Sequence, residues 1–180
     1  ETFDEPRRSL VKKMFDGPIG LEYFTAPASS RVEYHSAYPG GLCQHSLNVY
    51  GNAITLANAL APKRWDPRTI VFCSLFHDFG KIGDGVHPFY VPTVDDWKKK
   101  RGELYDIGKE CAQMPTSERG LFILQNHGVV MTADEYLAIR LNDGQYVAEN
   151  KYYANREPDL AIIIHMADLW ASRQEKSDGS

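Results

Sequence analysis

Residues 66–80 constrain the fold more than any other part of this 180-residue chain. Asp66-Pro67 is typical of a helix start, because an aspartate side chain caps the first turn and proline fits the first helical position. Apolar residues then lie on nearly every side of the helix: Ile70, Val71, Phe72, Leu75 and Phe76. Such a helix must be surrounded by other elements. It ends in His77-Asp78, whose ionisable side chains are costly to bury without partners, so the sequence predicts a central helix that ends at a polar site.

Helix signals recur along the rest of the chain. Apolar residues in 42–60 repeat at helical spacing, and this segment stops before Pro62. Thr132 and Glu135 form the Thr-x-x-Glu pattern of a capping box, which predicts the start of another helix. Further helices are expected over 6–15, 115–128 and 158–172. The sequence therefore predicts an all-α helical bundle with long irregular loops.

Two stretches carry no clean helical pattern. Between 82 and 114, glycine and proline interrupt the chain repeatedly, and a loop of this length is unusual unless it is functional or disordered. Its aromatic residues favour an ordered flap: Phe89, Tyr90, Trp97 and Tyr105. The second stretch, 142–156, contains Asp143-Gly144, which suggests a short hairpin.

Length and composition limit the class of protein. The 180 residues, 43% of them hydrophobic, suit a single domain over 1–172, and the composition of 173–180 predicts a disordered tail. A net charge of -4 argues against general binding of nucleic acid, which needs a basic excess. Three cysteines without a Cys-x-x-Cys pair indicate a reducing, cytoplasmic setting. No apolar run approaches the roughly 20 residues that cross a bilayer, so we expect no membrane association.

Two further ionisable residues lie in apolar helical settings, as His77 and Asp78 do. His45 belongs to the preceding predicted helix, which is consistent with two antiparallel helices that face each other across one site. Asp168 lies in an apolar run of the last helix and needs a cation or a hydrogen-bond network. Two imidazoles and two carboxylates suit one or two ions of Mn, Fe, Co, Ni or Zn, with Mg also acceptable. Such ions activate water and polarise phosphate groups.

Three segments, taken in order, resemble the HD-domain superfamily of metal-dependent phosphohydrolases. They are 34–49 with a Gly-Gly-Leu-x-x-His motif, 75–81 with His-Asp-x-Gly-Lys, and 165–172. The resemblance implies an all-helical HD-domain bundle with the ligands on facing helices. It also carries the metal role onto His45, His77, Asp78 and Asp168. The segments 89–92, 97–101 and 141–146 are similar to small stand-alone HD hydrolases of phages and bacteria.

One departure from this resemblance concerns the activation of water. Some HD nucleotidases have a glutamate three residues after the HD aspartate, where it orients the attacking water. This chain has Lys81 there, so we expect Lys81 to neutralise a phosphate oxygen and the metal beside Asp78 to activate water. His127, at a predicted helix C-terminus, is a candidate second-metal ligand or phosphate contact, although the helix dipole alone also favours an imidazole there.

Candidate substrate contacts lie around these motifs, each with an ordinary structural alternative. Arg31 either holds a phosphate through its forked guanidinium or pairs at the surface. His35 either contacts substrate or caps the next helix. Asp143 either holds a substrate group or hydrogen-bonds its own turn. Tyr38 and Trp97 are candidates for stacking on a base.

The cations of the flap and His165 have both a functional and a structural interpretation. The cations of 98–101, beside Trp97, form either a phosphate clamp or a solvated face. His165 shares a helical face with Asp168 and is expected to support it or to pack in the core. His87 is expected to be an exposed flap residue.

These observations predict a metal-dependent phosphohydrolase that cleaves a phosphoester of a small nucleotide-like substrate by metal-activated water. A second hypothesis is a 3'-5' exonuclease or phosphodiesterase acting on RNA or DNA ends, because Tyr-x-Gly-Gly-Leu before His45 also resembles HD-domain exoribonucleases. The acidic balance and the lack of room for an oligonucleotide-binding domain weigh against it. A third is a non-catalytic nucleotide-binding HD domain, against which the intact ligand set argues.

Overall fold

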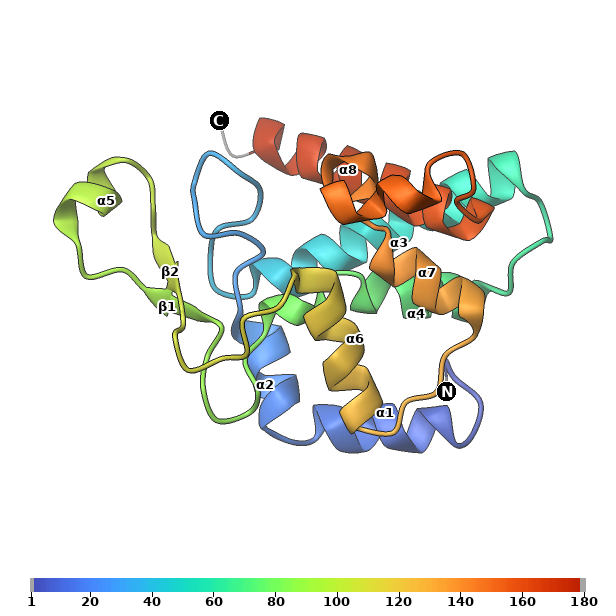
Figure 1. Cartoon of the computed structure of the whole chain (residues 1–180), viewed down its shortest axis with the longest axis horizontal. Helices are drawn as coiled ribbons and strands as arrows, with labels where there is room; N and C mark the ends of the chain where they lie inside the picture. Colours follow the sequence, from blue (N-terminus) through green and yellow to red (C-terminus); the bar gives the residue numbers. More distant parts are fainter. Residues whose placement is uncertain (1, 179–180) are drawn as a thin grey trace.

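The computed structural model describes residues 2–178, and this part of the chain is mostly helical with one short antiparallel strand pair (Figure 1). The α-helices are α1 (Arg7–Phe15), α2 (Pro18–Thr25), α3 (Gly41–Leu60), α4 (Pro67–Phe76), α5 (Asp96–Lys100), α6 (Thr116–Asn126), α7 (Ala133–Arg140) and α8 (Asp159–Asp178). The strands are β1 (Tyr90–Pro92) and β2 (Tyr105–Ile107). Short 3-10 helices are η1 (Phe79–Lys81), η2 (Gly144–Tyr146) and η3 (Ala148–Tyr153). The mostly helical class is confirmed.

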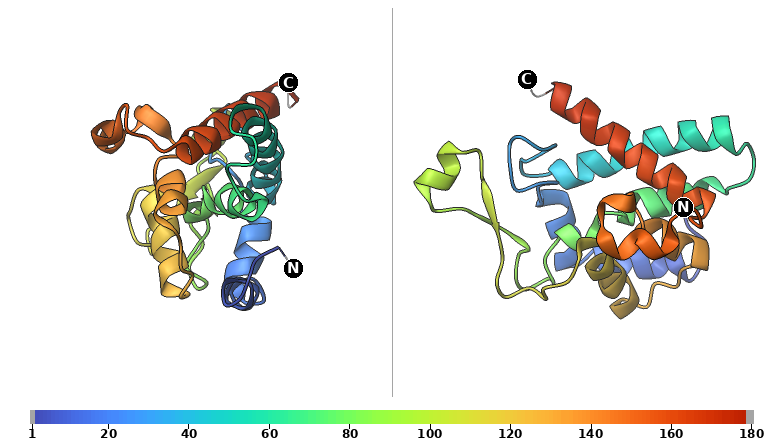
Figure 2. Two further views of the ribbon diagram at one scale, coloured as in Figure 1. Left: turned by 90° about the vertical axis from the view of Figure 1, so that its right-hand side faces the viewer. Right: turned by 45° about the horizontal axis from the view of Figure 1, so that its top comes forward.

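Helix α4 lies inside the packing, as its apolar composition predicts. It begins at the Asp66 cap, whose side chain accepts a hydrogen bond from the Arg68 amide. Its side chains Phe72 and Phe76 have no exposed surface. Helix α3 packs against both α4 and α8, and α8 crosses over α3 (Figures 1 and 2). Burial of each large apolar side chain in such a core contributes roughly 1.5–3 kcal/mol.

The chain leaves α4 through a tight turn. Helix α4 ends at Phe76, His77 is its C-cap, and η1 follows. The turn packs closely on α6, where a Cβ atom at Gly80 would lie 1.9 Å from the Thr116 carbonyl oxygen. Only glycine fits this approach without a backbone shift, and it holds the turn that carries His77 and Asp78 against α6.

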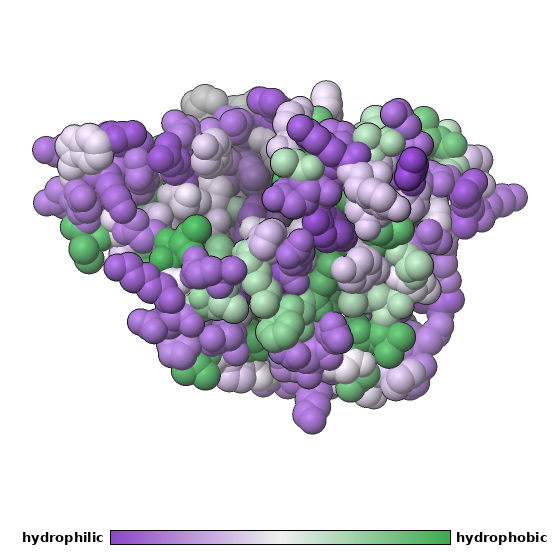
Figure 3. Space-filling model, in the orientation of Figure 1, coloured by the Kyte–Doolittle hydropathy of each residue, from purple (hydrophilic) through white to green (hydrophobic). Residues whose placement is uncertain are grey.

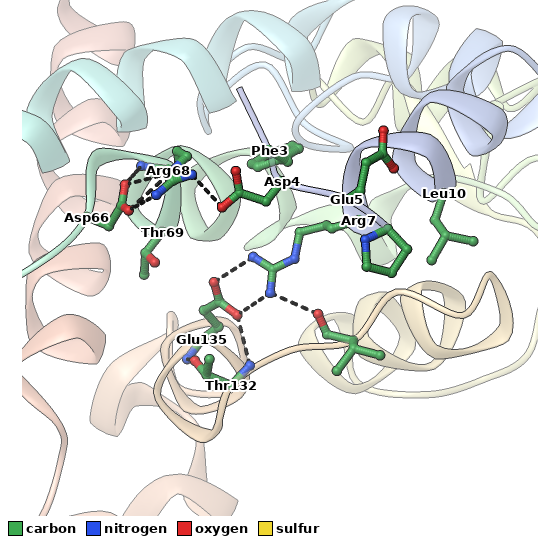
Figure 4. A pocket seen from close by; sticks show the side chains of 12 residues that line it. Phe3, Asp4, Glu5, Arg7, Leu10, Asp66, Arg68, Thr69, Thr132 and Glu135 are labelled. Atoms are coloured by element: carbon green, nitrogen blue, oxygen red, sulfur yellow. Dashed lines mark hydrogen bonds and ion pairs between the residues drawn. The ribbon is translucent and has the colours of Figure 1, made fainter. Parts of the chain in front are cut away.

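An ion-pair cluster fixes the N-terminal segment near the start of α4 (Figure 4). The guanidinium of Arg7 donates to both carboxylate oxygens of Glu135, at 2.8 Å each. Arg68 pairs with Asp66 and Asp4, each at 2.5 Å. These five residues, called here the N-terminal ion-pair cluster, line a cavity of about 350 Å³. Each of its carboxylates meets a guanidinium, so the cluster compensates its own charge.

Most of the predicted helices are confirmed. The segments 6–15, 42–60, 115–128 and 158–172 correspond to α1, α3, α6 and α8, and α8 extends beyond the predicted end. The capping box is present, because the Thr132 hydroxyl accepts from the Glu135 amide and the Glu135 carboxylate from the Thr132 amide. Helix α4 ends earlier than Gly80, because η1 tightens the chain there. The eight-residue helix α2 is not predicted from the sequence, because it is too short to show a clear apolar repeat.

The hairpin expected around Asp143-Gly144 is wrong. These residues lead into η2, and η3 follows, so the chain there stays in tight helical turns with no strand. The strand pair lies instead in the flap, where Tyr90 is opposite Ile107 and α5 occupies the far end (Figure 1). An Asp-Gly pair favours a turn, but a hairpin also needs extended chain on both sides of it. The ordered flap itself is confirmed.

The disordered tail expected over 173–180 is wrong for most of its length. Helix α8 continues to Asp178, and residues 179–180 lie outside the described part of the chain. Polar composition misled the prediction, because Glu175 is anchored by tertiary hydrogen bonds. Between residues 2 and 178, no helix has both the length and the apolar character needed to span a membrane.

Candidate metal centre

Four side chains from three helices converge beside the turn that follows α4. His45 comes from α3, His77 and Asp78 from the end of α4, and Asp168 from α8. The packing of α3 against both other helices brings them together. Both imidazoles have no exposed surface, the Asp78 side chain is 7% exposed and the Asp168 side chain 18%. The four residues form a buried polar cluster inside an apolar core.

The potential ligand atoms of this cluster face one another. His45 Nε2 lies 3.0 Å from Asp168 Oδ1, 3.3 Å from His77 Nε2 and 3.7 Å from Asp78 Oδ2. His77 Nε2 lies 3.5 Å from Asp78 Oδ2 and 3.9 Å from Asp168 Oδ1. Bonds from a transition metal to such atoms are about 2.0–2.2 Å long, so ligands around one ion lie roughly 3–4 Å apart. The observed separations fall in that range.

The other nitrogen of each imidazole is held by an acceptor. His77 Nδ1 lies 2.7 Å from the Ser74 carbonyl oxygen. His45 Nδ1 lies 3.0 and 3.2 Å from the two carboxylate oxygens of Glu175. Histidines that bind metals usually donate their second N–H to a carbonyl or carboxylate, which orients the ring and makes it a better ligand. Both Nε2 atoms are thereby directed at the cluster.

Glu175 is itself fixed by neighbours. The Ser36 hydroxyl donates to its Oε2 at 2.6 Å, and the Asn48 amide donates to its Oε1 at 2.8 Å. Glu175 is not among the site residues predicted from the sequence, because the predicted last helix ends at Ser172. Glu175 lies seven residues after Asp168, on the same helical face, so a longer predicted helix would have placed it at the site.

Positive and negative side chains lie close together around the cluster and compensate one another. Lys81 Nζ lies 2.6 Å from Asp78 Oδ2. Burial disfavours the Asp78 carboxylate, but Lys81 and His77 outweigh that effect and hold the pKa of Asp78 well below its ordinary value. Burial also disfavours the Lys81 ammonium, and the Asp78 charge outweighs it and raises the pKa of Lys81. Asp78 and Lys81 are therefore both charged across the neutral pH range.

His45 responds to the remaining negative charge. Burial favours the neutral ring, but hydrogen bonds with Asp168 and Glu175 and the charge of Asp78 outweigh it and raise the pKa of His45 to about 9. In the absence of a metal, a proton on this imidazole offsets the carboxylates around it. A divalent cation among the same groups would offset them more fully, and the buried cluster could hold such an ion.

His35 is brought to this cluster by the loop before α3. Its ring centroid lies 4.4 Å from that of His45, and ligand atoms of His35, His45 and Asp78 lie within 4.8 Å of one another. Burial and then the charge of His45 lower the pKa of His35 to about 4. A neutral imidazole so close to the ligand atoms can contact a metal or a substrate, which fits its predicted role as a site residue.

Asp143 and Tyr38 lie near the centre without a direct bond to it. Desolvation by the surrounding protein, and then the negative charge of Asp78, raise the pKa of Asp143. Tyr38, 49% exposed, lines a surface cavity together with Glu175.

His165 Nδ1 lies 2.6 Å from the Asn142 carbonyl oxygen, to which it is hydrogen-bonded. This bond gives His165 a structural role beside η2.

The structure does not bring His127 to the cluster. It is the exposed C-cap of α6. The contact of α6 with the site is at its other end, where Gly120 faces Gly80. Seven residues of helix span roughly 10 Å, and the next residue, Gly128, packs near Leu10 of α1. The exposed end of a helix is reason enough for a histidine there.

Three of the flap cations, Lys98, Lys99 and Arg101, pair with carboxylates, and so does Arg31. Lys98 pairs with Asp106 at 2.5 Å, and Arg31 pairs with Glu33 at 3.0 Å and Glu103 at 3.1 Å. Trp97 is 63% exposed and lies under the guanidinium of Arg101, 4.3 Å from the ring centroid. In Figure 3 the projecting end of the flap is mostly hydrophilic. The pairing matches the alternative of a solvated face and leaves the predicted phosphate contact of Arg31 and the stacking of Trp97 without support.

Comparison with protein-family models, with curated proteins and with solved structures finds no match to this chain. The case for a function therefore depends on the geometry of the cluster and on the sequence motifs that form it.

Proposed function

We propose that this chain is a metal-dependent phosphohydrolase of the HD-domain type, acting on a phosphoester of a small nucleotide-like substrate. The observation that carries the proposal is the convergence of His45, His77, Asp78 and Asp168 at metal-ligand separations, with both imidazoles oriented from behind. Structural ion-pair clusters also bury charge, but they do not need three negative groups around two imidazoles.

The ligand set favours borderline divalent ions. Nitrogen and carboxylate oxygen without thiolate suit Mn, Fe, Co, Ni or Zn, and Mg less well because it prefers oxygen. A bound ion supplies Lewis acidity toward water and toward a phosphoryl oxygen. His35 and Asp78 offer, with His45, a second overlapping grouping, which is consistent with one or two ions.

The protein side chains position the substrate and the charge. Lys81 lies at the edge of the cluster with its ammonium on Asp78 Oδ2, where it can share its remaining protons with a phosphate oxygen. Lys81 occupies the position at which some HD nucleotidases have glutamate. The burden of water activation accordingly falls on the metal and its ligand Asp78.

The test is a screen of phosphomonoesters, phosphodiesters and labelled oligonucleotides with each candidate metal, with and without chelator. Asp78→Asn should lose bound metal and all turnover. Asp84→Asn is the matched control, because Asp84 is an exposed flap carboxylate and should leave both unchanged. Equal turnover in wild type and Asp78→Asn would overturn the proposal. Cleavage of oligonucleotide ends alone would favour the nuclease hypothesis, and ligand binding without turnover the non-catalytic one.

A further inference from the structure

A cavity of about 360 Å³ adjoins the metal centre and has an unusual lining. Three cationic side chains line it, Lys81, Arg173 and Lys176, together with three serines and two tyrosines. None of the described residues in its lining carries a carboxylate. The cavity at the N-terminal ion-pair cluster, of nearly the same volume, is lined by four carboxylates. Ammonium, guanidinium, hydroxyl and imidazole groups all donate hydrogen bonds to anions, so the composition of this lining points to an anion.

Helix α8 supplies the metal centre and the cavity from adjacent faces. Asp168 and Glu175 point toward His45, whereas Arg173 and Lys176 line the cavity. Residues three or four apart share a helical face, so one rigid helix sets the distance between the carboxylates and the cations. A ligand in the cavity would therefore lie beside the face of α8 that carries the candidate metal ligand Asp168.

Lys81 and His35 join the two sites, since each lines the cavity and also contacts the metal cluster. The Nε2 atom of His35 is buried and has no hydrogen-bond partner in the described part of the protein. Buried polar atoms are seldom left unpaired, so this nitrogen is suited to a partner supplied by a ligand. The end of the cavity nearest Asp78 thus combines a cation, an imidazole and the metal ligands.

We propose that this cavity binds a phosphomonoester, whose phosphate is held by Lys81, Arg173 and Lys176. The inference deepens the proposed function and rests on it. A phosphate monoester carries about two negative charges near pH 7, whereas a diester carries one. The second charge of a phosphomonoester strengthens its binding when Lys81, Arg173, Lys176 and a metal surround it. The reason is that charge-assisted hydrogen bonds are stronger than neutral ones.

The experiment compares wild type with the double variant Arg173→Gln/Lys176→Gln. The control is Lys13→Gln/Lys63→Gln, which makes the same change of net charge elsewhere on the surface. For each metal-loaded protein, kcat/KM is measured for 4-nitrophenyl phosphate and for bis(4-nitrophenyl) phosphate. Binding of inorganic phosphate is measured by calorimetry, and metal content by elemental analysis.

We expect the double variant to lose about tenfold or more in kcat/KM for the monoester, chiefly through KM, and about threefold or less for the diester. The Kd for inorganic phosphate should rise about tenfold, with metal content unchanged. Equal losses for both esters, or unchanged phosphate binding, would overturn the inference. If the wild type cleaves neither these esters nor any phosphoester in the screen that tests the proposed function, the proposed function fails, and phosphate binding by the two double variants still decides whether the cavity is an anion site.

Discussion

Two clusters of charged side chains lie at opposite ends of α4, and they are built differently. Near the start of the helix, Arg7 and Glu135 form a forked ion pair, with Arg68 beside it on Asp66. Near its end, Asp78 meets one ammonium, and the carboxylates of Asp168 and Glu175 meet the imidazole of His45. The first cluster is complete within the protein. In the second cluster, the excess negative charge is offset by a proton on His45 or by a bound cation.

Under the proposed function, this is the difference between a structural cluster and a functional one. A guanidinium and a carboxylate match in charge and shape, and removing either leaves the other buried and uncompensated. Carboxylates and imidazoles that share a site can instead hold a cation that is supplied from outside. We therefore expect mutations in the first cluster to change stability without changing function, and mutations in the second to do the reverse.

The largest expected effect is that of Asp168→Asn on metal binding. Loss of a direct ligand should weaken binding by more than about 100-fold, beyond the effect typical of outer hydrogen-bond partners. Asparagine Oδ1 can still accept from His45, so the metal-free protein should keep its stability to within about 1 kcal/mol. Metal titration and urea unfolding measure the two quantities. Retention of wild-type affinity would remove Asp168 from the ligand set.

Glu135→Ala should have the opposite profile. It leaves Arg7 without its partner and breaks the capping box of α7, and we expect the free energy of unfolding to fall by about 3 kcal/mol. Metal affinity and turnover, measured well below the unfolding midpoint, should equal those of wild type. A parallel loss of metal binding would show that the two clusters are coupled and do not act independently.

Glu175→Gln tests whether the second cluster depends on orientation as well as on ligands. The amide keeps its contacts with Ser36 or Asn48 but no longer offers His45 a charged acceptor. Metal affinity should fall by about 10–100-fold while a stoichiometric ion still binds at high metal concentration. Glu149→Gln, on the exposed 3-10 helix η3, is the control. An affinity equal to that of the control would assign Glu175 to packing alone.

The smallest expected effect concerns pH at the start of α4. Hydrogen bonds from Arg68 lower the pKa of Asp66 from 3.8 to about 2. Because the folded-state pKa lies below the usual value, this pair stabilises the fold above about pH 4, and the stabilisation disappears as pH falls toward 2. The small gap in urea midpoint between wild type and Arg68→Ala should therefore narrow from pH 6 to pH 2. A gap that stays constant with pH would exclude Asp66 as its source.

Local patterns account for much of the fold. Caps at Asp66 and Thr132 mark helix starts because they act within a few residues of the chain. The burial of His77, Asp78 and His45 follows from their apolar helical settings. The hairpin and α2 are harder to predict from the sequence, because the formation of a strand pair or a short helix depends on the elements that pack against it. Thus Asp143-Gly144 correctly predicts a turn, but the chain there forms a 3-10 helix and not a hairpin.

The sequence by itself determined the main helices and the fact that four ionisable side chains in them need a partner. Only the tertiary structure decided which partners they have. His45 and Glu175 are 130 residues apart, and their contact depends on the packing of α3 against α8. The same packing places His35 at the site, leaves His127 at the far end of α6 and sets the cations of α8 around a cavity. Burial energies reveal that a polar group requires compensation, whereas only the three-dimensional arrangement of the helices determines which group provides it.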